Sequence, residues 1–485
     1  MEEVTDSFTE ARVVQQWQRL FKKLAKECGI DHRLFRGVNF RERMERMRAF
    51  YDEGLLKPIV KDAVKSLPGV VVVDKVDLVG SRRDVSESKL VCAGSRFIGG
   101  ERLAEEFPDY FNLFVSASQF NLLESPNEYH ANLYDYSLDR TQGPTVCSLS
   151  LLGCLKRESQ YDDDQLGDML DEDVKREFKS VYQAGYLKAG FLEESQAQKL
   201  VLTLLKNPVK YAYQEIVSDV QKNPAYEKCC RQIFMSALSY QHSIDGFVRS
   251  AVTYVTLRGQ YINALKDAIN TARKFPNKQV ALHIPCVGGG AFRNPKGTAQ
   301  LAFMNAYGLL EPEMDGNLTV FLHGGDFFWN YDFEDIIRTC ACDVINDFDA
   351  ISEHICLSDQ DKQLLGAARE ELEQVDSSVV DKFIAKRGGT YYVRSDSAHL
   401  CLLHKAAKAG DVAEIERLLA AGVMIDGIDD NLNTALFVAA ENGQKVAAER
   451  LLAAGAETEA IYATNKSPLS IAMERDHMDI AEMLK

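Results

Sequence analysis

The sequence predicts an α/β domain that follows a helical extension and precedes an all-α stack of repeats. Apolar, strand-like runs alternate with helical stretches from about Val70 to Trp329, which is typical of a sheet flanked by helices. The last part of the chain repeats itself at an offset of 33 residues. A chain of 485 residues also exceeds one ordinary core. The expected segments are a helical extension at 1–68, the α/β domain at 69–330, a helical linker at 331–396 and the repeats at 397–485.

The composition is that of a soluble globular protein, with 46% hydrophobic and 26% charged residues. The net charge of −16 disfavours nucleic acid as a partner, because such binding depends on a basic surface. No apolar run reaches the roughly 20 residues that span a bilayer, and the acidic N-terminus does not resemble a signal peptide. The eleven scattered cysteines indicate a reducing compartment. We therefore expect a cytoplasmic protein with no membrane span, or one that leaves its cell without a cleaved signal.

An acidic run lies between Asp162 and Asp173. A solvated helix start or loop is the favoured interpretation, and a site for a metal or a basic partner is the alternative. The close cysteine pairs, Cys229–Cys230 and Cys340–Cys342, lack the spacing of zinc ligands. The sequence therefore predicts neither a metal nor a cofactor.

Five apolar runs are predicted to be strands, with helices between and beyond them. Glycines or polar loops, rather than tight hairpin turns, flank most of these runs. The expected strands are Gly69–Asp74, Tyr110–Ser118, Thr145–Gly153, Gln279–Gly290 and Leu318–Gly325. The expected helices are Asp173–Ala189, Ala197–Leu205, Ser250–Phe275 and Lys296–Tyr307, with amphipathic helices in Arg12–Gly54 and a helical stretch in Phe333–Phe383.

The C-terminal segment contains two stretches of closely matching sequence. HKAAKAGDVAEIERLLAAG, from His404, aligns with FVAAENGQKVAAERLLAAG, from Phe437, and a third unit begins at Ser467. Small alanines let two helices pack closely, and glycines such as Gly410 and Gly443 supply turns between helices. The period and the turn residues resemble ankyrin repeats. The resemblance implies about three stacked units that bind another protein, each burying its apolar face against its neighbour.

Polar residues gather where two of the predicted strands end. Gln119, Asn121 and Glu124 follow one strand, Asp139–Pro144 precedes the next, and the glycines of Gly288–Gly290 close a third. Ligands of open α/β sheets lie at the carboxyl ends of strands. A glycine triplet lets backbone N–H groups turn toward a diphosphate. The pattern favours a polar ligand site, while a hydrogen-bonded loop and a tight strand-to-helix turn are the alternatives.

Three short motifs resemble one protein family. They are QFN-x-LE at Gln119–Glu124, DRTQGP at Asp139–Pro144 and GGGAF at Gly288–Phe292. Together they resemble the macrodomain family of ADP-ribose binders and ADP-ribosyl hydrolases, in an atypical branch found in microbial proteins and bacterial effectors. The resemblance covers about Val70–Trp329 and implies a macrodomain-like mixed sheet flanked by helices.

The sequence departs from the usual macrodomain pattern at three points. The Asn-Ala-Ala-Asn catalytic loop is absent, and Ser116–Asn121 stands at the analogous strand end. Arg293 occupies a position where the family usually has glycine, and the Glu-Glu pair of poly(ADP-ribose) glycohydrolases is missing. Binding of ADP-ribose therefore carries over better than catalysis.

The resemblance also implies how ADP-ribose would be held. Gly288–Phe292 would bind the diphosphate and the distal ribose, and Gln119, Asn121 and Glu124 would meet the ribose or the adenine. Removal of ADP-ribose passes through an oxocarbenium-like centre that a carboxylate can assist. The candidate carboxylates are Glu124, Asp139 and Asp326, each of which could instead cap a helix or pair with an arginine. The expected ligand contacts are Gln119, Phe120, Asn121, Arg140, Thr141, Gln142, Gly143, Gly288, Gly289, Gly290, Ala291, Phe292 and Asn294.

The resemblances together predict an enzyme that binds ADP-ribose and hydrolyses it from a modified protein recruited by the ankyrin repeats. Ankyrin repeats fused to an enzyme-like domain resemble effectors that bacteria deliver into a host cytosol, so a host protein is the expected partner. Two alternatives stay open. The chain could bind ADP-ribosylated protein without cleaving it, or it could be a scaffold that only binds proteins.

Overall fold

The computed structural model describes a large part of the chain, which divides into two compact units. One unit comprises residues 1–88, 98–320 and 332–381, and the other comprises 89–97, 321–331 and 382–485. The helices predicted in Arg12–Gly54 lie outside the described residues. The described residues are 62, 64–83, 89–93, 110–123, 151–215, 230–240, 247–285, 287–288, 292–323, 333–354, 356–373, 397–420, 425, 433–456, 458 and 467–484.

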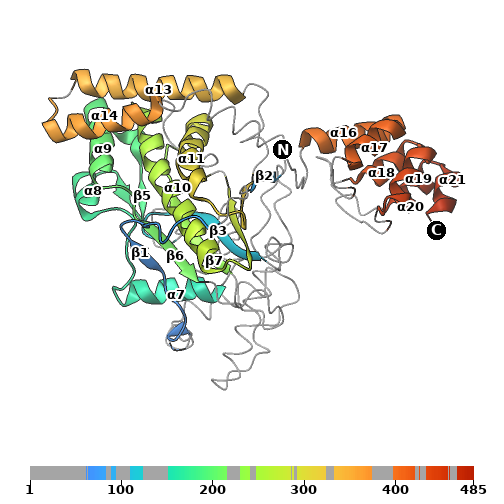
Figure 1. Ribbon diagram of the computed structural model, residues 1–485, viewed down its shortest axis with the longest axis horizontal. Helices are drawn as coiled ribbons and strands as arrows, with labels where there is room; N and C mark the ends of the chain where they lie inside the picture. Colours follow the sequence, from blue (N-terminus) through green and yellow to red (C-terminus); the bar gives the residue numbers. More distant parts are fainter. Residues whose placement is uncertain are drawn as a thin grey trace. The chain divides into compact units, whose positions relative to one another are not determined.

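A mixed β-sheet is the framework of the α/β part of the chain (Figure 1). Its seven strands follow the order β1-β6-β7-β3-β8-β9-β2. Strand β3 is parallel to both of its neighbours, β7 and β8, whereas β6 is antiparallel to β7 and to β1. The prediction of a mixed sheet flanked by helices is confirmed. The strands are β1 (Val71–Val73), β2 (Lys89–Ala93), β3 (Tyr110–Ser118), β6 (Tyr211–Glu215), β7 (Cys230–Ser236), β8 (Gln279–Ile284) and β9 (Leu318–His323).

Strand β3 lies at the centre of the sheet because its side chains suit burial on both faces. Apart from Tyr110 and Ala117, all its residues are buried, as expected for a parallel strand covered on both sides. Its bounds coincide with the predicted strand, and β1, β8 and β9 each fall within a predicted apolar run.

Strands β6 and β7 were not expected from the sequence, although β7 pairs directly with β3. Both carry buried polar residues that interrupt the apolar pattern. Gln214 Nε2 donates to the carbonyl oxygens of Pro68, at 3.0 Å, and Gly153, at 3.1 Å. Gln232 Nε2 donates to Ser116 Oγ at 3.1 Å. These partners come from distant parts of the chain, so local sequence does not reveal that the polar groups are satisfied.

The helices surround the sheet and form a further layer beyond it (Figure 1). Helix α10 packs against the sheet, α11 packs on α10, and α13 packs across both. Helix α14 contacts α13 and α9, so the stretch Phe333–Phe383, predicted to be helical, contributes two packed helices. The helices are α7 (Leu151–Asp162), α8 (Glu172–Glu177), α9 (Glu194–Lys206), α10 (Arg249–Lys274), α11 (Lys296–Leu310), α13 (Phe333–His354) and α14 (Asp359–Glu373). None of the helices in the described part of the chain has the length and apolarity needed to span a bilayer.

Helices α7 and α10 cover opposite faces of β6 and β7. On the α7 side, Arg157 donates to Gln214 Oε1 at 2.9 Å, and its guanidinium lies 4.9 Å from the centre of the Phe234 ring. On the α10 side, Asp267 Oδ1 accepts a hydrogen bond of 2.6 Å from Arg231. Successive side chains of a strand point to opposite faces, so these contacts place one helix on each side.

Two predicted elements are wrong at least in part. The predicted helix Asp173–Ala189 is helical only in α8 and is followed by a β-hairpin of β4 (Tyr182–Gln183) and β5 (Tyr186–Leu187). Ala184 and Gly185, between the two strands, have φ values of +48° and +81°. Positive φ at both central residues is typical of a two-residue hairpin and stops a helix. The end of the predicted strand Thr145–Gly153 belongs to helix α7, whereas its first six residues lie outside the described residues.

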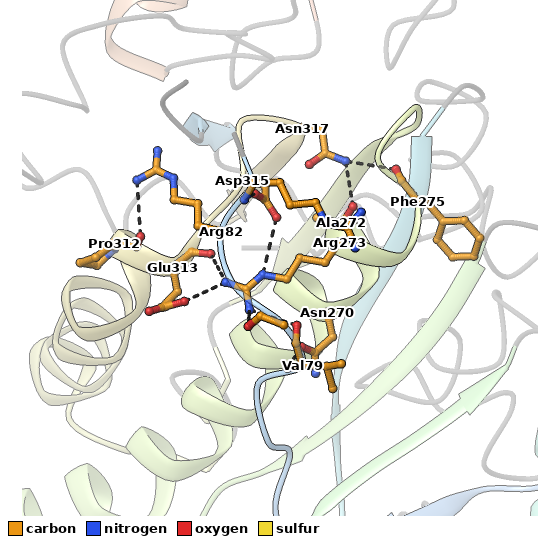
Figure 2. A network of polar contacts seen from close by, with 12 residues as sticks. Val79, Arg82, Asn270, Ala272, Arg273, Phe275, Pro312, Glu313, Asp315 and Asn317 are labelled. Carbon is orange, nitrogen blue, oxygen red and sulfur yellow. Dashed lines mark hydrogen bonds and ion pairs between the residues drawn. The ribbon is translucent and has the colours of Figure 1, made fainter. Parts of the chain in front are cut away.

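A buried arginine near the end of α10 forms hydrogen bonds with the segment after β1 (Figure 2). Arg273 Nη1 donates to the carbonyl oxygens of Val79, at 3.2 Å, and Gly80, at 2.8 Å. Its Nη2 donates to the main-chain oxygen and to Oε2 of Glu313, both at 2.8 Å. Asn270, one turn earlier on α10, accepts from Val79 N–H at 2.8 Å. The segment has no regular structure of its own, so these bonds satisfy backbone groups that no strand partner reaches.

The described residues from Ser397 onward contain three helix pairs around an alanine-rich core. Ala407, Ala440 and Ala472 are fully buried in this core. Thr434 caps α18 and Ser467 caps α20, each accepting a backbone N–H three residues later. The helices are α16 (Ser397–Ala409), α17 (Val412–Ala420), α18 (Ala435–Glu441), α19 (Lys445–Ala453), α20 (Pro468–Glu474) and α21 (Met478–Met483).

Candidate functional site

The parallel strands β3, β7 and β8 all end at one edge of the sheet. Ser118, the last residue of β3, pairs with Ser236, the last residue of β7. The loops that follow parallel strands converge at this edge, which is where ligands bind in open α/β sheets. Two of the three sequence motifs begin in these loops, after β3 and after β8.

The loop after β3 is buried and held by its main chain. Gln119 and Phe120 are each only 1% exposed. The carbonyl oxygen of Phe120 accepts a hydrogen bond of 2.8 Å from Met169 N–H. Asn121 Oδ1 accepts from Leu123 N–H at 3.2 Å, which closes a tight turn. The motif therefore begins as an ordered, partly buried turn.

The loop after β8 depends on a glycine and an asparagine. Gly288 has a φ of +75°, and a Cβ at this position would lie 2.5 Å from the Cβ of Ala237, so only glycine fits. Asn294 donates from its backbone N–H to Gly288 O at 3.1 Å and from Nδ2 to Leu238 O at 2.8 Å. Thr253 Oγ1 donates to Asn294 Oδ1 at 3.1 Å. The loop is thus tied to the loop after β7.

Helix α11 begins directly after this loop. Its N-cap is Pro295, which provides no side-chain hydrogen bond to the first turn. Arg293, just before it, is exposed and has a φ of +57°. Phe292 is 6% exposed, and its carbonyl oxygen accepts from Tyr240 N–H at 3.0 Å. The first N–H groups of α11 therefore lack a side-chain cap from Pro295, and a helix N-terminus of this kind can bind an anion.

The β4–β5 hairpin joins the two motif loops. Gly185 O accepts from Phe120 N–H at 3.0 Å, and Tyr186 Oη accepts from Gln119 Nε2 at 2.5 Å. The ring of Tyr186 meets the ring of Phe292 edge to face, with centroids 5.6 Å apart. The hairpin therefore contacts residues of both motifs.

A half-buried carboxylate anchors the other strand of this hairpin. Tyr182 Oη donates to Asp168 Oδ2 at 2.6 Å, and Leu170 N–H donates to Asp168 Oδ1 at 2.8 Å. Lys175 Nζ lies 3.4 Å from Oδ2. Burial raises the pKa of Asp168, although the hydrogen bonds from Tyr182 and Leu170 act in the opposite direction. Asp168 belongs to the acidic run that was expected to form a helix start or loop, and Asp171 in that run caps α8.

The described residues include six of the expected site residues: Gln119, Phe120, Asn121, Gly288, Phe292 and Asn294. They lie in the two neighbouring loops just described. Outside the described residues are Glu124, Asp139, Arg140, Thr141, Gln142, Gly143, Gly289, Gly290, Ala291 and Asp326. Within the described parts, no three His, Cys, Asp or Glu side chains are grouped as metal ligands.

The sequence interpretation missed the hairpin and its Tyr186. A local signal exists, because the glycine of Tyr182-Gln183-Ala184-Gly185-Tyr186 stands between two tyrosines, as in a short hairpin. Charged residues between Glu172 and Lys179 precede it and favour a helix, which is how the helical interpretation extended too far.

Comparison with known families assigns the C-terminal part of the chain. A family described as ankyrin repeats (3 copies) matches residues 403–485, and a second match of the same family covers 367–462. No curated protein matches the sequence. The match agrees with the three helix pairs, with the caps at Thr434 and Ser467, and with the 33-residue period. Residues 403–485 are therefore ankyrin repeats, which support a role in binding other proteins.

Proposed function

We propose that the α/β unit binds ADP-ribose and that the ankyrin repeats recruit the protein that carries it. The observation that carries the proposal is the contact that both motif loops make with one residue of the hairpin, Tyr186. Gln119, from QFN-x-LE, and Phe292, from GGGAF, both touch Tyr186. Motifs separated by more than 160 residues of chain thus share one edge of the sheet, where α/β proteins bind nucleotides.

The loop after β8 suits a diphosphate. Gly288 adopts positive φ and packs against Ala237 with no room for a Cβ, so the turn at this position depends on glycine. The first N–H groups of α11 follow, without a side-chain cap. Backbone N–H groups at a helix N-terminus favour negative charge. In this proposal Gly288–Phe292 hold the diphosphate, and Arg293, which is exposed, is available to the same charge.

The proposed reaction is hydrolysis of the bond between ribose C1″ and a side chain of the modified protein. A carboxylate takes a proton from water as the water oxygen bonds to C1″, and the released side chain accepts a proton. Glu124, Asp139 and Asp326 are the candidates for this carboxylate. Asp139 and Glu124 come first because they belong to the two motifs that follow β3 in sequence.

The second candidate function is a reader that binds ADP-ribosylated protein without cleaving it. The absence of the Asn-Ala-Ala-Asn loop favours this alternative. Release of ADP-ribose from a modified protein separates the two functions. Release by the wild type that is lost in Asp139→Asn or Glu124→Gln, with ADP-ribose binding retained, supports the hydrolase. Binding without any release supports the reader.

Isothermal titration of the full chain with free ADP-ribose tests the shared core of the proposal. Gly289→Glu, which places a carboxylate in the glycine loop, should abolish binding by charge repulsion and by filling the loop. Gly366→Glu on α14 is the matched control, because nothing lies within 4 Å of a Cβ built there. The control should bind like the wild type. No heat from the wild type at millimolar ligand contradicts both the hydrolase and the reader.

A further inference from the structure

The β4–β5 hairpin touches all three loops at the carboxyl edge of the parallel strands. It meets the loop after β3 through Gly185 and the loop after β8 through Tyr186. It meets the loop after β7 through the hydrogen bond of 3.0 Å from Ser239 N–H to Leu187 O. Among the described residues, β4 and β5 pair with each other and not with the main sheet, so the hairpin reaches this edge through its contacts with the loops.

The fit between hairpin and loop is close. A Cβ on Gly185 would overlap the amide group of Asn121, so the Asn121 side chain lies directly on the glycine. Ala184 holds a φ of +48°, a region that costs a residue with a Cβ about 1 kcal/mol. Non-glycine residues in such strained conformations persist where the surroundings hold them, often beside ligands.

One short segment anchors both the hairpin and the loop after β3. Tyr182 donates to the half-buried Asp168 at 2.6 Å, and Met169, the next residue, donates from its N–H to Phe120 O at 2.8 Å. The same short segment therefore supports both the hairpin and the loop after β3. With its base fixed in this way, Tyr186 presents its hydroxyl to Gln119 from a rigid position.

From these contacts we propose that Tyr186 is a positioning residue of the ADP-ribose site, which acts by holding the Gln119 amide and the Phe292 ring in their ligand-binding orientation. The inference rests on the proposed function. Tyr186 acts through Gln119 and is not itself assigned a contact with the ligand. A side chain that is fixed before binding loses less rotamer entropy when the ligand binds. Removing the Tyr186 hydroxyl, which fixes Gln119, should therefore weaken the affinity for ADP-ribose.

The test is a double-mutant cycle on the affinity of the full chain for ADP-ribose, measured by titration calorimetry. The variants are Tyr186→Phe, Gln119→Ala and the double variant. Tyr186→Phe keeps the ring against Phe292 and removes only the hydroxyl. It should weaken binding about fivefold, the size of one hydrogen bond. In the Gln119→Ala background the same change should alter affinity less than about twofold, because residues that act as one unit are not additive.

Tyr213→Phe on β6 is the matched control, and it should leave affinity unchanged. Its ring packs on the guanidinium of Arg231, and phenylalanine keeps that ring. The melting temperature of every variant is measured beside its affinity, since a merely structural role would lower stability without coupling to Gln119.

Each outcome of the cycle decides the inference. If the wild type binds ADP-ribose and Tyr186→Phe binds it with equal affinity, the positioning role of Tyr186 is overturned. The proposed function is not affected by that result. Equal effects of Tyr186→Phe in both backgrounds, or failure of this variant to fold, overturn the positioning role as well, because the hydroxyl would then serve the fold. Absence of wild-type binding overturns the proposed function, and the inference falls with it.

Discussion

Asn294 Nδ2 lies 2.8 Å from the carbonyl oxygen of Leu238 and joins the loop after β8 to the loop after β7. The same nitrogen donates to Gly288 O at 3.2 Å, and Oδ1 accepts from Thr253. Every polar atom of this side chain therefore has a protein partner, and the residue is 4% exposed. The sequence motif places Asn294 among the expected ligand contacts. The geometry shows that its side chain also holds the loop after β8 in place.

Replacement of Asn294 by alanine should lower the free energy of unfolding of the α/β unit by about 2–3 kcal/mol, because it leaves buried carbonyl and hydroxyl groups without their partner. Urea unfolding of the full chain, followed by far-ultraviolet circular dichroism, gives the measurement. Asn277→Ala at an exposed turn is the control and should change stability by less than about 0.5 kcal/mol. Equal stabilities of Asn294→Ala and the control would show that the loop does not depend on this side chain.

Arg273 should be among the most sensitive single positions of the α/β unit. Its guanidinium is 3% exposed and bonds to two carbonyl oxygens of the segment after β1 and to Glu313. Arg273→Met removes the donors and leaves Glu313 and the carbonyls unpaired, at a cost of about 3 kcal/mol.

Arg82→Ala is the natural comparison, because Arg82 makes a hydrogen bond of 3.4 Å to Pro312 O at the edge of the same network (Figure 2). This bond is long and exposed, so its loss should cost less than about 0.5 kcal/mol. The comparison is made by thermal unfolding at pH 7. A melting temperature for Arg273→Met equal to that of Arg82→Ala would contradict the conclusion that Arg273 contributes strongly to the stability of the α/β unit.

The sequence predicts the strands of the sheet whose buried residues are mainly apolar. It does not predict the strands that bury polar residues. Strand β3 was predicted with its observed bounds because nearly every residue in it is buried and most are apolar. Strand β7 was missed, since Arg231 and Gln232 hide its pattern. Their partners, Glu215, Asp267 and Ser116, lie in other elements. Only the fold shows that these polar groups are satisfied.

The candidate site shows the same division. The glycine of positive φ at Gly288 could be expected, because a glycine triplet after a strand has a local cause. The contact of Gln119 with Tyr186 could not be expected, because it joins residues that are far apart in sequence. Tyr186 also belongs to a hairpin that was predicted to be helical because of the charged residues before it. Sequence motifs identified the loops, and tertiary packing decides which side chains support them.

The contact between α9 and α14 should respond to acid. Lys206 Nζ lies 2.6 Å from Asp361 Oδ1, and Ser358 Oγ donates to Oδ2 at 2.5 Å. The hydrogen bond from Lys206, followed by that from Ser358, lowers the pKa of Asp361 below its ordinary value of 3.8. A carboxylate with a lowered pKa stabilises the fold above its unfolded-state pKa, and this stabilisation is lost as pH falls through the folded-state value.

Asp361→Asn should therefore be less stable than the wild type at pH 7, and the difference should shrink as the pH falls below about 4. Thermal unfolding at several pH values between 7 and 3 gives the comparison. Asp359→Asn, at a fully exposed site on the same helix, should show no such convergence. A stability difference for Asp361→Asn that stays constant across this range would contradict the linkage.

Gly443 illustrates how one ankyrin repeat depends on the next. Its φ is +68°, and a Cβ at this position would lie 2.7 Å from Cε1 of His477 in the following repeat. Gly410, one repeat earlier, meets Gln444 in the same way. Gly443→Ala should destabilise the repeats by about 2 kcal/mol, by adding a steric overlap between repeats to the cost of positive φ.

Gly455→Ala separates these two causes. Gly455 has a φ of +95°, but nothing lies within 4 Å of a Cβ built on it, so its substitution carries the backbone cost alone. Unfolding of the repeats is followed in the full chain by hydrogen exchange of α18–α21. Gly443→Ala should open these helices more often than Gly455→Ala does. Replacing His477 by alanine in the Gly443→Ala protein should remove the excess, because the added methyl group then has space. Equal exchange in the two glycine variants would mean that the overlap with His477 is relieved at no cost, and that stacking between these repeats tolerates the change.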